Sequence, residues 1–385
     1  MKQKVRSIAL ICDDFPSEGR PVYTFVKQLV DEMVRQGMEV HVIAPQSVTK
    51  NIIRRIPWRP YKSHVQLDEG VGYDIYRPYS ISLGNHFRNI NLRKFPVMHV
   101  LRQLHVDAVY CHFWHNASPV YEYCLKQQLP IFVACGEGDN AMEDLITYTP
   151  KNLISQLKQA VKGVISVSSE NKDKCIRYSL AKPEQIVVLP NCVDQTLFHP
   201  ARNTSLRHLL GVTENDFLIA FTGGFIERKG STRLCQAINQ LNDPSIKIMF
   251  IGSTVRGEGS DEPECSGMVF RGSLSHEKIA AYLQAADAFV LPTLKEGCSN
   301  AIVEALATGL PVISSNGAFN NDILDDTNSL RIDPLSVDEI KDAIYTLKND
   351  IRLYAQLKAK AEHDAGSHSI VERTKQILSF MQSLC

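Results

Sequence analysis

The sequence has no hydrophobic run long enough to cross a membrane. Its long apolar stretches, such as 8–12 and 286–291 (the latter with Asp287 inside it), have the length of a β-strand, whereas a spanning helix needs about 20 apolar residues. The run near the start ends at Asp13 and is too short for the core of a signal peptide, so it predicts a first strand. We therefore expect a cytoplasmic protein.

Cysteine pairs, net charge and low-complexity tracts are also lacking. No two of the ten cysteines are spaced as Cys-x-x-Cys, which argues against a disulfide framework or a zinc site and favours reduced thiols. Lys plus Arg and Asp plus Glu both number 42, so no global field attracts nucleic acid. The charge is uneven, because residues 1–190 have a net charge of +6 and the remainder −6.

Short apolar runs alternate with amphipathic stretches in two series, and 385 residues suit two domains better than one core. This rhythm predicts the α/β class, with two doubly wound, Rossmann-like domains whose parallel sheets are covered on both faces. We expect an N-terminal domain at 1–190, a C-terminal domain at 191–366, and a last helix at about 367–385 that packs back on the first domain. The proline-bounded segment 190–200 is the expected hinge. The expected strands are 5–12, 39–44, 107–111, 131–134, 163–167, 185–189, 216–222, 247–252, 268–270, 287–291 and 311–314.

The most informative stretch, 291–313, predicts strand, loop, helix, Gly stop and strand. Ser299 or Asn300 is a natural N-cap for a helix over 301–308. The residues before it, Gly297 and Cys298, lead into a helix start whose backbone N–H groups and dipole favour a diphosphate. Glu304 lies about one turn further on, where a carboxylate can accept ribose hydroxyls, and Glu296 lies before the helix, within reach of sugar hydroxyls.

Glu296 and Glu304 form an E-x7-E pair, and in this setting the chain resembles the retaining glycosyltransferases of family GT4, which have the GT-B fold. The resemblance extends over nearly the whole chain and is strongest at 183–312. The segment 183–200 is similar to the family's hinge, 223–230 to the segment whose Lys binds the donor diphosphate, and 269–272 to the loop that frames the nucleotide base.

The resemblance implies the roles of the site residues. The residues it implies for catalysis are Lys229, Glu296, Asp139 and His112. Those it implies for donor binding are Gly19, Gly224, Lys229, Arg271, Gly297, Cys298, Ser299, Asn300 and Glu304.

The chain departs from the family's pattern at three positions. Gly224 stands where Arg is common beside the Lys, and Arg228 or Arg20 could supply that charge. Arg20 itself replaces the second Gly of the first loop, where it could add a phosphate contact. Cys135 stands where His is common. A thiol cannot replace His as a donor to a sugar hydroxyl, so a positioning role falls to Asp139.

The implied reaction is a retaining transfer from a nucleotide sugar, with no cofactor. Lys229 and the helix start at Ser299 and Asn300 would stabilise the leaving diphosphate electrostatically. The leaving phosphate would take the acceptor's proton. No Asp-x-Asp pair lies in a suitable loop, and His112 and His115 lack a nearby carboxylate cluster, so we expect no metal.

Two other functions stay open, namely a non-catalytic nucleotide-sugar-binding subunit and a sugar-nucleotide 2-epimerase. A nicotinamide dehydrogenase is disfavoured because the loop after the first strand lacks Gly-x-Gly-x-x-Gly.

The expected partners are a UDP- or GDP-sugar donor and a saccharide or lipid-linked saccharide acceptor, used in assembly of a surface polysaccharide. Basic and apolar residues mix at 51–62, which contains Arg54, Arg55 and Arg59, and at 87–102. This mixture predicts either solvated faces or peripheral contact with an anionic membrane on its cytoplasmic side. A short patch in a neutral protein does not predict nucleic-acid binding.

Overall fold

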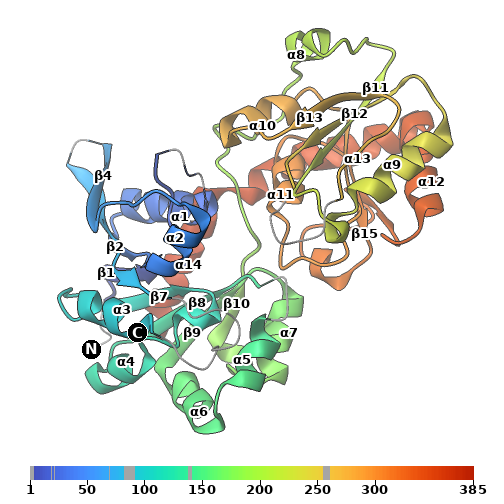
Figure 1. Cartoon of the computed structure of the whole chain (residues 1–385). Coiled ribbons are helices and arrows are strands. Elements are labelled where there is room, and N and C mark those ends of the chain that lie inside the picture. Colours follow the sequence, from blue (N-terminus) through green and yellow to red (C-terminus); the bar gives the residue numbers. More distant parts are fainter. Residues whose placement is uncertain are drawn as a thin grey trace. The chain divides into compact units, whose positions relative to one another are not determined.

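The computed structural model describes residues 4–18, 20, 22–68, 70–81, 92–137, 141–254 and 261–385. The chain divides into two compact units. Unit 1 comprises Met1–Leu189 and Ile370–Cys385, and unit 2 comprises Pro190–Ser369. Each unit has a sheet flanked by helices (Figure 1). No helix in the described part of the chain is long and apolar enough to cross a membrane.

Unit 1 has an eight-stranded sheet in the order β10-β9-β8-β7-β1-β2-β5-β4. Its strands are β1 Ser7–Ile11, β2 Glu39–Ile43, β4 Lys62–Asp68, β5 Val71–Tyr76, β7 Ala108–His112, β8 Ile131–Cys135, β9 Val161–Ser166 and β10 Ile186–Val188. The short strands β3 Gln46–Ser47 and β6 Tyr79–Ser80 pair separately. The helices are α1 Thr24–Arg35, α2 Val48–Arg54, α3 Lys94–Leu101, α4 Tyr121–Gln127, α5 Ala141–Tyr148, α6 Lys151–Ala160, α7 Ser169–Arg177 and α14 Ile370–Leu384.

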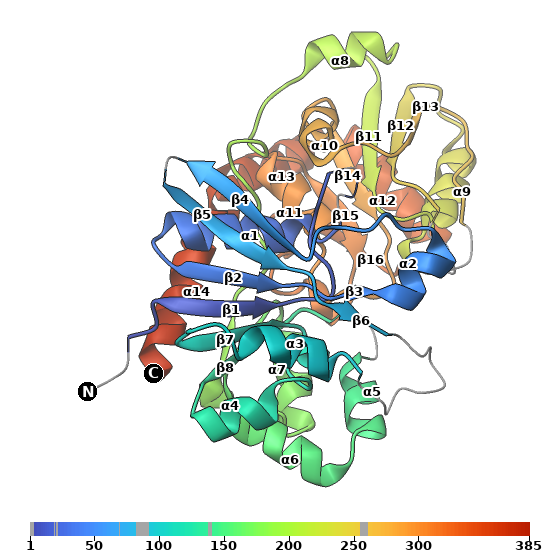
Figure 2. The same ribbon diagram turned by 60° about the vertical axis from the view of Figure 1, so that its left-hand side comes forward.

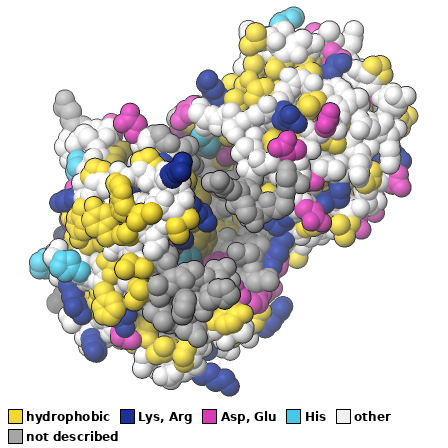
Figure 3. All heavy atoms as spheres, in the orientation of Figure 1, with side chains coloured by type: hydrophobic (Ala, Val, Ile, Leu, Met, Phe, Trp, Pro, Cys, Tyr) yellow, Lys and Arg dark blue, Asp and Glu magenta, His cyan; other side chains and the backbone are white. Residues whose placement is uncertain are grey.

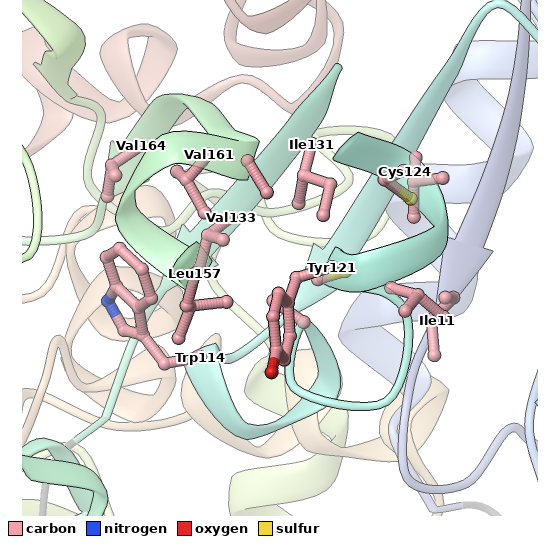
Figure 4. Close-up of a cluster of buried hydrophobic side chains, with 14 of the residues drawn as sticks. Ile11, Trp114, Tyr121, Cys124, Ile131, Val133, Leu157, Val161 and Val164 are labelled. Atoms are coloured by element: carbon pink, nitrogen blue, oxygen red, sulfur yellow. The ribbon is translucent and has the colours of Figure 1, made fainter. Parts of the chain in front are cut away.

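Helices cover both faces of this sheet, because its central strands are apolar on both sides. One core contains Val30 and Met33 of α1 together with Ile377 of α14. The other core lies under α3, α4 and α6. Figure 4 shows its Trp114 and Tyr121 among strand and helix side chains.

The last helix, α14, lies beside α1 (Figure 2). Met381 on α14 is fully buried, and the side-chain oxygen of Gln382 accepts a hydrogen bond of 3.1 Å from the backbone N–H of Val5. The end of the chain is therefore part of the core of unit 1.

Unit 2 has six parallel strands in the order β13-β12-β11-β14-β15-β16. They are β11 Phe217–Thr222, β12 Ile246–Ile251, β13 Met268–Gly272, β14 Ala288–Leu291, β15 Val312–Ser315 and β16 Ser329–Ile332. The helices are α8 Thr204–Leu209, α9 Ser231–Leu241, α10 His276–Leu283, α11 Asn300–Ala307, α12 Val337–Asn349 and α13 Ile351–Asp364.

The expected α/β class is confirmed, and the sequence prediction is wrong in one feature of the first sheet. That sheet is not wholly parallel, because β4 runs antiparallel to β5 at its edge. The prediction also omitted the short strands β3 and β6, and β4, β5 and β16. In β4 the exposure alternates residue by residue, which is the usual pattern of a half-buried edge strand. The signal available in the sequence was the alternation of polar and apolar residues at 64–68.

Candidate functional site

The candidate donor site of unit 2 begins where the strand order changes direction. β11 pairs with β12 on one side and with β14 on the other. In such sheets ligands bind beyond the carboxyl ends of the strands at this switch point. The loops after β11 and β14 therefore meet there, and they contain Lys229 and Glu296.

Lys229 forms an ion pair with Glu296. Lys229 ends a short 3-10 helix, Glu227–Lys229, and its Nζ donates to Oε1 of Glu296. The hydroxyl of Thr293 donates to the same oxygen at 2.8 Å. Both charged side chains are largely buried. Because Arg228 also contacts this carboxylate, at 3.3 Å, two cations share one acid and leave a local excess of positive charge.

Arg228 is the second cation beside Glu296. Gly224, which stands where Arg is common in the family, offers no charge. Nη1 of Arg228 also donates to the carbonyl of Lys295 at 2.7 Å, which fixes the guanidinium beside Glu296 while 40% of the side chain stays exposed. The expected alternative, Arg20, lies in unit 1 and pairs there with Asp14 at 2.8 Å. Its side chain is thus engaged by an acid within unit 1, and a phosphate contact of Arg20 stays a prediction.

Glycines allow the two loops to approach each other closely. Gly230 has a φ of +78°, a conformation that residues with a Cβ rarely adopt. A Cβ there would lie 2.6 Å from the carbonyl oxygen of Pro292. At Gly223 a Cβ would lie 3.6 Å from Cδ of Lys229, so the lysine stem packs along bare backbone.

The start of α11 lies next to this ion pair in sequence. The helix begins at Asn300 with Ser299 at the N-cap position, but the Ser299 side chain makes no cap hydrogen bond. Ser299 is thus the N-cap residue, as predicted, without the side-chain hydrogen bond that such a cap usually makes, and the helix start is correct within one residue. No acidic residue lies in the first turn, so the positive end of the dipole is not neutralised from within the helix.

Asn191 holds the loop that leads into this helix. Its side-chain amide donates to the carbonyl of Cys298 at 3.0 Å and to the side-chain oxygen of Asn300 at 2.7 Å. Gly297 and Cys298 are buried in the same loop. Sequence reasoning did not single out Asn191, because its partners lie more than 100 residues away.

Glu304 is buried one turn inside α11, and His276 is its partner. Nε2 of His276, the first residue of α10, lies 3.1 Å from Oε1 of Glu304. Burial lowers the pKa of His276, but the hydrogen bond to Glu304 and the charges of Glu304, Glu277 and Asp194 outweigh it, so the pKa is raised. This histidine was also missed.

The Arg271 side chain contacts the segment that precedes β13. Its Nη1 donates to the carbonyl of Pro263 at 3.1 Å and lies 3.9 Å from the Glu262 carboxylate. The backbone of Gly272, next in β13, accepts a hydrogen bond from Gly252 at 2.9 Å. These contacts leave a donor-binding role of Arg271 as a prediction.

In unit 1, His112 ends β7 among aromatic rings. Its ring centre lies 5.2 Å from that of Phe25 and 4.3 Å from that of Phe113. Neither ring nitrogen has a hydrogen-bond partner among the described residues. Burial lowers the pKa of His112 to about 3, so the ring is neutral at neutral pH. Two further predicted residues, Gly19 and Asp139, lie outside the described residues.

Asp13, directly after β1, contacts a guanidinium and an imidazole. It pairs with Arg93 and with His115, each at 2.7 Å. Burial opposes these contacts, but together they hold the pKa of Asp13 well below its usual range. Because β1 and β7 are paired, Asp13 and His112 belong to neighbouring strand ends.

Cys135 points into the core rather than replacing a histidine. Its Sγ lies 3.6 Å from Sγ of Cys175 and 3.8 Å from Sδ of Met142. The hydrogen bond with Cys175 and burial raise its pKa. A few residues on, buried Glu137 accepts a hydrogen bond from the backbone of Trp114 at 2.9 Å.

Within the described ranges, no three His, Cys, Asp or Glu side chains come together in a way that could hold a metal ion. All ten cysteines are free thiols.

Two family models match most of the chain between them. "Glycosyltransferase Family 4" matches residues 22–197, and "Glycosyl transferases group 1" matches residues 216–350. The matches correspond to the bulk of unit 1 and of unit 2 respectively.

Curated relatives have glycosyltransferase names. The chain is 24% identical over 351 residues, 88% of each sequence, to the putative teichuronic acid biosynthesis glycosyltransferase TuaC of Bacillus subtilis (strain 168). It is 27% identical over 231 residues to the UDP-Gal:alpha-D-GlcNAc-diphosphoundecaprenol alpha-1,3-galactosyltransferase of Escherichia coli, covering 56% of this chain and 58% of that one.

Solved structures share the fold at low identity. Sucrose-phosphate synthase from Thermosynechococcus elongatus has a TM-score of 0.75 at 17% identity and covers 98% of this chain and 99% of its own. HepE from Anabaena, in complex with UDP-glucose, has a TM-score of 0.72 at 18% identity, with the same coverage. The chain is a GT-B glycosyltransferase of family 4, the group 1 glycosyl transferases.

Proposed function

We propose that this glycosyltransferase transfers a sugar from a UDP- or GDP-sugar to a saccharide or lipid-linked saccharide acceptor, with retention of anomeric configuration. The observation that carries the proposal is the pair of cations, Lys229 and Arg228, on the single carboxylate of Glu296. A leaving diphosphate needs positive charge that is already in place when the glycosidic bond breaks. Lys229, which is largely buried, and Arg228, which is partly exposed, together meet that need.

The donor is held by residues of unit 2. Lys229, Arg228 and the backbone N–H groups at the start of α11 bind the diphosphate. Glu304, buried beyond them, accepts hydrogen bonds from the ribose, and Glu296 accepts them from the sugar. The leaving phosphate takes the acceptor's proton, so the reaction needs no protein base.

The acceptor is held by residues of unit 1. His112 is neutral at neutral pH, so it can both accept and donate a hydrogen bond to a sugar hydroxyl. The aromatic rings of Phe25 and Phe113 beside it offer apolar faces to a sugar ring. The names of the TuaC and galactosyltransferase relatives, one for teichuronic acid and one for a diphosphoundecaprenol acceptor, support a role in surface polysaccharide assembly.

A thermal-shift panel of UDP, GDP and their sugars tests the donor. A ligand at 100 times its dissociation constant stabilises the protein by about 2.7 kcal/mol, so one nucleotide series should raise the unfolding temperature. Release of nucleoside diphosphate from the stabilising sugar, and the anomeric configuration of the product, then test transfer and retention. A protein that no nucleotide or nucleotide sugar stabilises would contradict the proposal.

We propose that the transfer needs no divalent metal, because Lys229 and Arg228 provide the charge that a metal would otherwise supply. Turnover should be the same after treatment with a chelator. Activity that the chelator abolishes and Mg²⁺ or Mn²⁺ restores would contradict this.

We also propose that unit 1 touches an anionic membrane surface on its cytoplasmic side. Large apolar side chains of α2, the following loop and β6 are exposed, with Ile53 80%, Trp58 52% and Tyr79 51% accessible. Trp58 and Tyr79 contact each other, with ring centres 5.7 Å apart. Hydrophobic, Lys and Arg side chains are interspersed on unit 1 in Figure 3. Exposed Arg54 and Arg55 would each contribute about 1 kcal/mol at an anionic surface.

Arg59 must be left out of this surface, contrary to the sequence expectation. It is 8% exposed and pairs with Asp14. Part of the second basic stretch, 87–91, lies outside the described residues.

Co-sedimentation with liposomes tests the membrane proposal. We expect binding to vesicles of phosphatidylglycerol and phosphatidylcholine, weaker binding at high salt, and loss of binding in an Arg54→Glu, Arg55→Glu variant. Vesicles of phosphatidylcholine alone are the control. Wild-type protein that stays in the supernatant at low salt would favour a soluble acceptor.

A further inference from the structure

His276 contacts a buried carboxylate from a different element of unit 2. Nε2 of His276 lies 3.1 Å from Oε1 of Glu304. His276 is the first residue of α10, and Glu304 lies within α11. Glu304 is 7% exposed. A carboxylate removed from water to this extent requires a hydrogen-bond partner or a counter-charge, and His276 supplies one.

The imidazole of His276 is held in place by its surroundings. Its ring centre lies 5.0 Å from that of Phe198, which is fully buried, with the planes tilted by 57°. The ring is therefore packed on one side and hydrogen-bonded at Nε2. A residue fixed in this way can fix its partner's orientation as well.

The charges that face His276 are acidic. They come from Glu304 on α11, from Glu277 beside it on α10, and from Asp194 in the segment that precedes α8. These acids favour an N–H donor on the His276 ring. An ionised carboxylate can accept a hydrogen bond at each of its two oxygens. With Oε1 bound to His276, the remaining lone pairs of Glu304 have a defined direction.

We propose that His276 is a positioning residue for the ribose of the donor. It holds Oε1 of Glu304 so that the carboxylate is oriented for the 2′- and 3′-hydroxyls before the nucleotide binds. The inference rests on the proposed function, in which Glu304 accepts those hydroxyls. The inference adds to donor recognition a residue outside the E-x7-E pair. His276 acts through Glu304 and does not touch the substrate.

Calorimetric titration with nucleotides that differ only in the ribose hydroxyls tests the inference. UDP and GDP are each compared with their 2′,3′-dideoxy analogues on wild type, His276→Phe and His276→Gln. Phe keeps the ring contact with Phe198 but has no donor, whereas Gln retains an N–H near the position of Nε2. We expect His276→Phe to bind the hydroxylated nucleotide about tenfold more weakly, while the affinity for the dideoxy analogue is unchanged, and we expect His276→Gln to recover most of the loss.

The outcomes separate this inference from the function on which it rests. Wild type that binds neither UDP nor GDP overturns both. If wild type binds one of them and His276→Phe binds it with the same affinity, only the role of His276 is overturned. A His276→Phe variant that loses affinity equally for the hydroxylated and dideoxy nucleotides shows a general structural effect and likewise overturns it. Circular dichroism and thermal unfolding establish that the variants are folded.

Discussion

Lys229 and Glu296 are 67 residues apart in the chain, yet the lysine ammonium donates to Oε1 of the glutamate. The contact forms because β11 and β14 are neighbours in the sheet and both loops leave it at the same edge. The ion pair joins the two motifs that most strongly indicate a nucleotide-sugar site.

Replacing Lys229 by Ala should reduce turnover about 30- to 1000-fold, because a charged contact to the leaving diphosphate contributes about 2 to 4 kcal/mol to the transition state. The fold should survive, since Lys229 ends a short 3-10 helix outside the apolar core and Glu296 keeps Arg228 as a partner. Steady-state rates measure the effect. Lys341→Ala, which removes a cation paired with exposed Asp338 on α12, is the matched control and should leave the rate unchanged.

Replacing Gly230 by Ala should destabilise unit 2 by about 3 kcal/mol. The left-handed φ costs roughly 1 to 2 kcal/mol for a residue with a Cβ, and the collision with the carbonyl of Pro292 adds to it. Gly211→Ala is the control, because its φ is also positive, +70°, but nothing lies within 4 Å of its Cβ. Scanning calorimetry should show a smaller loss of stability for Gly211→Ala than for Gly230→Ala. Equal losses of stability would contradict the collision with Pro292.

Replacing Arg59 by Met should destabilise unit 1 by about 3 kcal/mol. The change leaves Asp14 without its buried partner, and breaking a buried ion pair from one side is costly. Arg54→Met should stay within about 0.5 kcal/mol, because Arg54 is exposed. Thermal unfolding compares the two variants. A stable Arg59→Met protein would show that the pair contributes little.

The contribution of His276 to stability should depend on pH. The pKa of His276 is raised in the folded protein, so the stabilisation is fully present below the ordinary value of about 6.5 and is lost as the pH rises through the folded pKa. The difference in unfolding temperature between wild type and His276→Phe should therefore be larger at about pH 6 than at about pH 8.5. A difference that grows with pH would contradict the raised pKa.

The local patterns in the sequence are sufficient for much of the fold. Buried parallel strands appear as short apolar runs, and α1 ends just before Gly37, a residue type typical of helix ends, which has a φ of +86°. Helix α11 begins at Asn300, within one residue of its expected start at 301. These features depend on neighbours within a few residues, and such information lies in the sequence itself.

The sequence alone also determined which residues are candidates for the donor site, through the spacing of Glu296 and Glu304 and through Lys229 in the segment 223–230. Only the tertiary structure decided their partners. Arg228 joins Lys229 at Glu296, His276 pairs with Glu304, and Arg59 is buried against Asp14. Each of these depends on strand order and on burial, which bring together residues far apart in the chain, and no local periodicity specifies them.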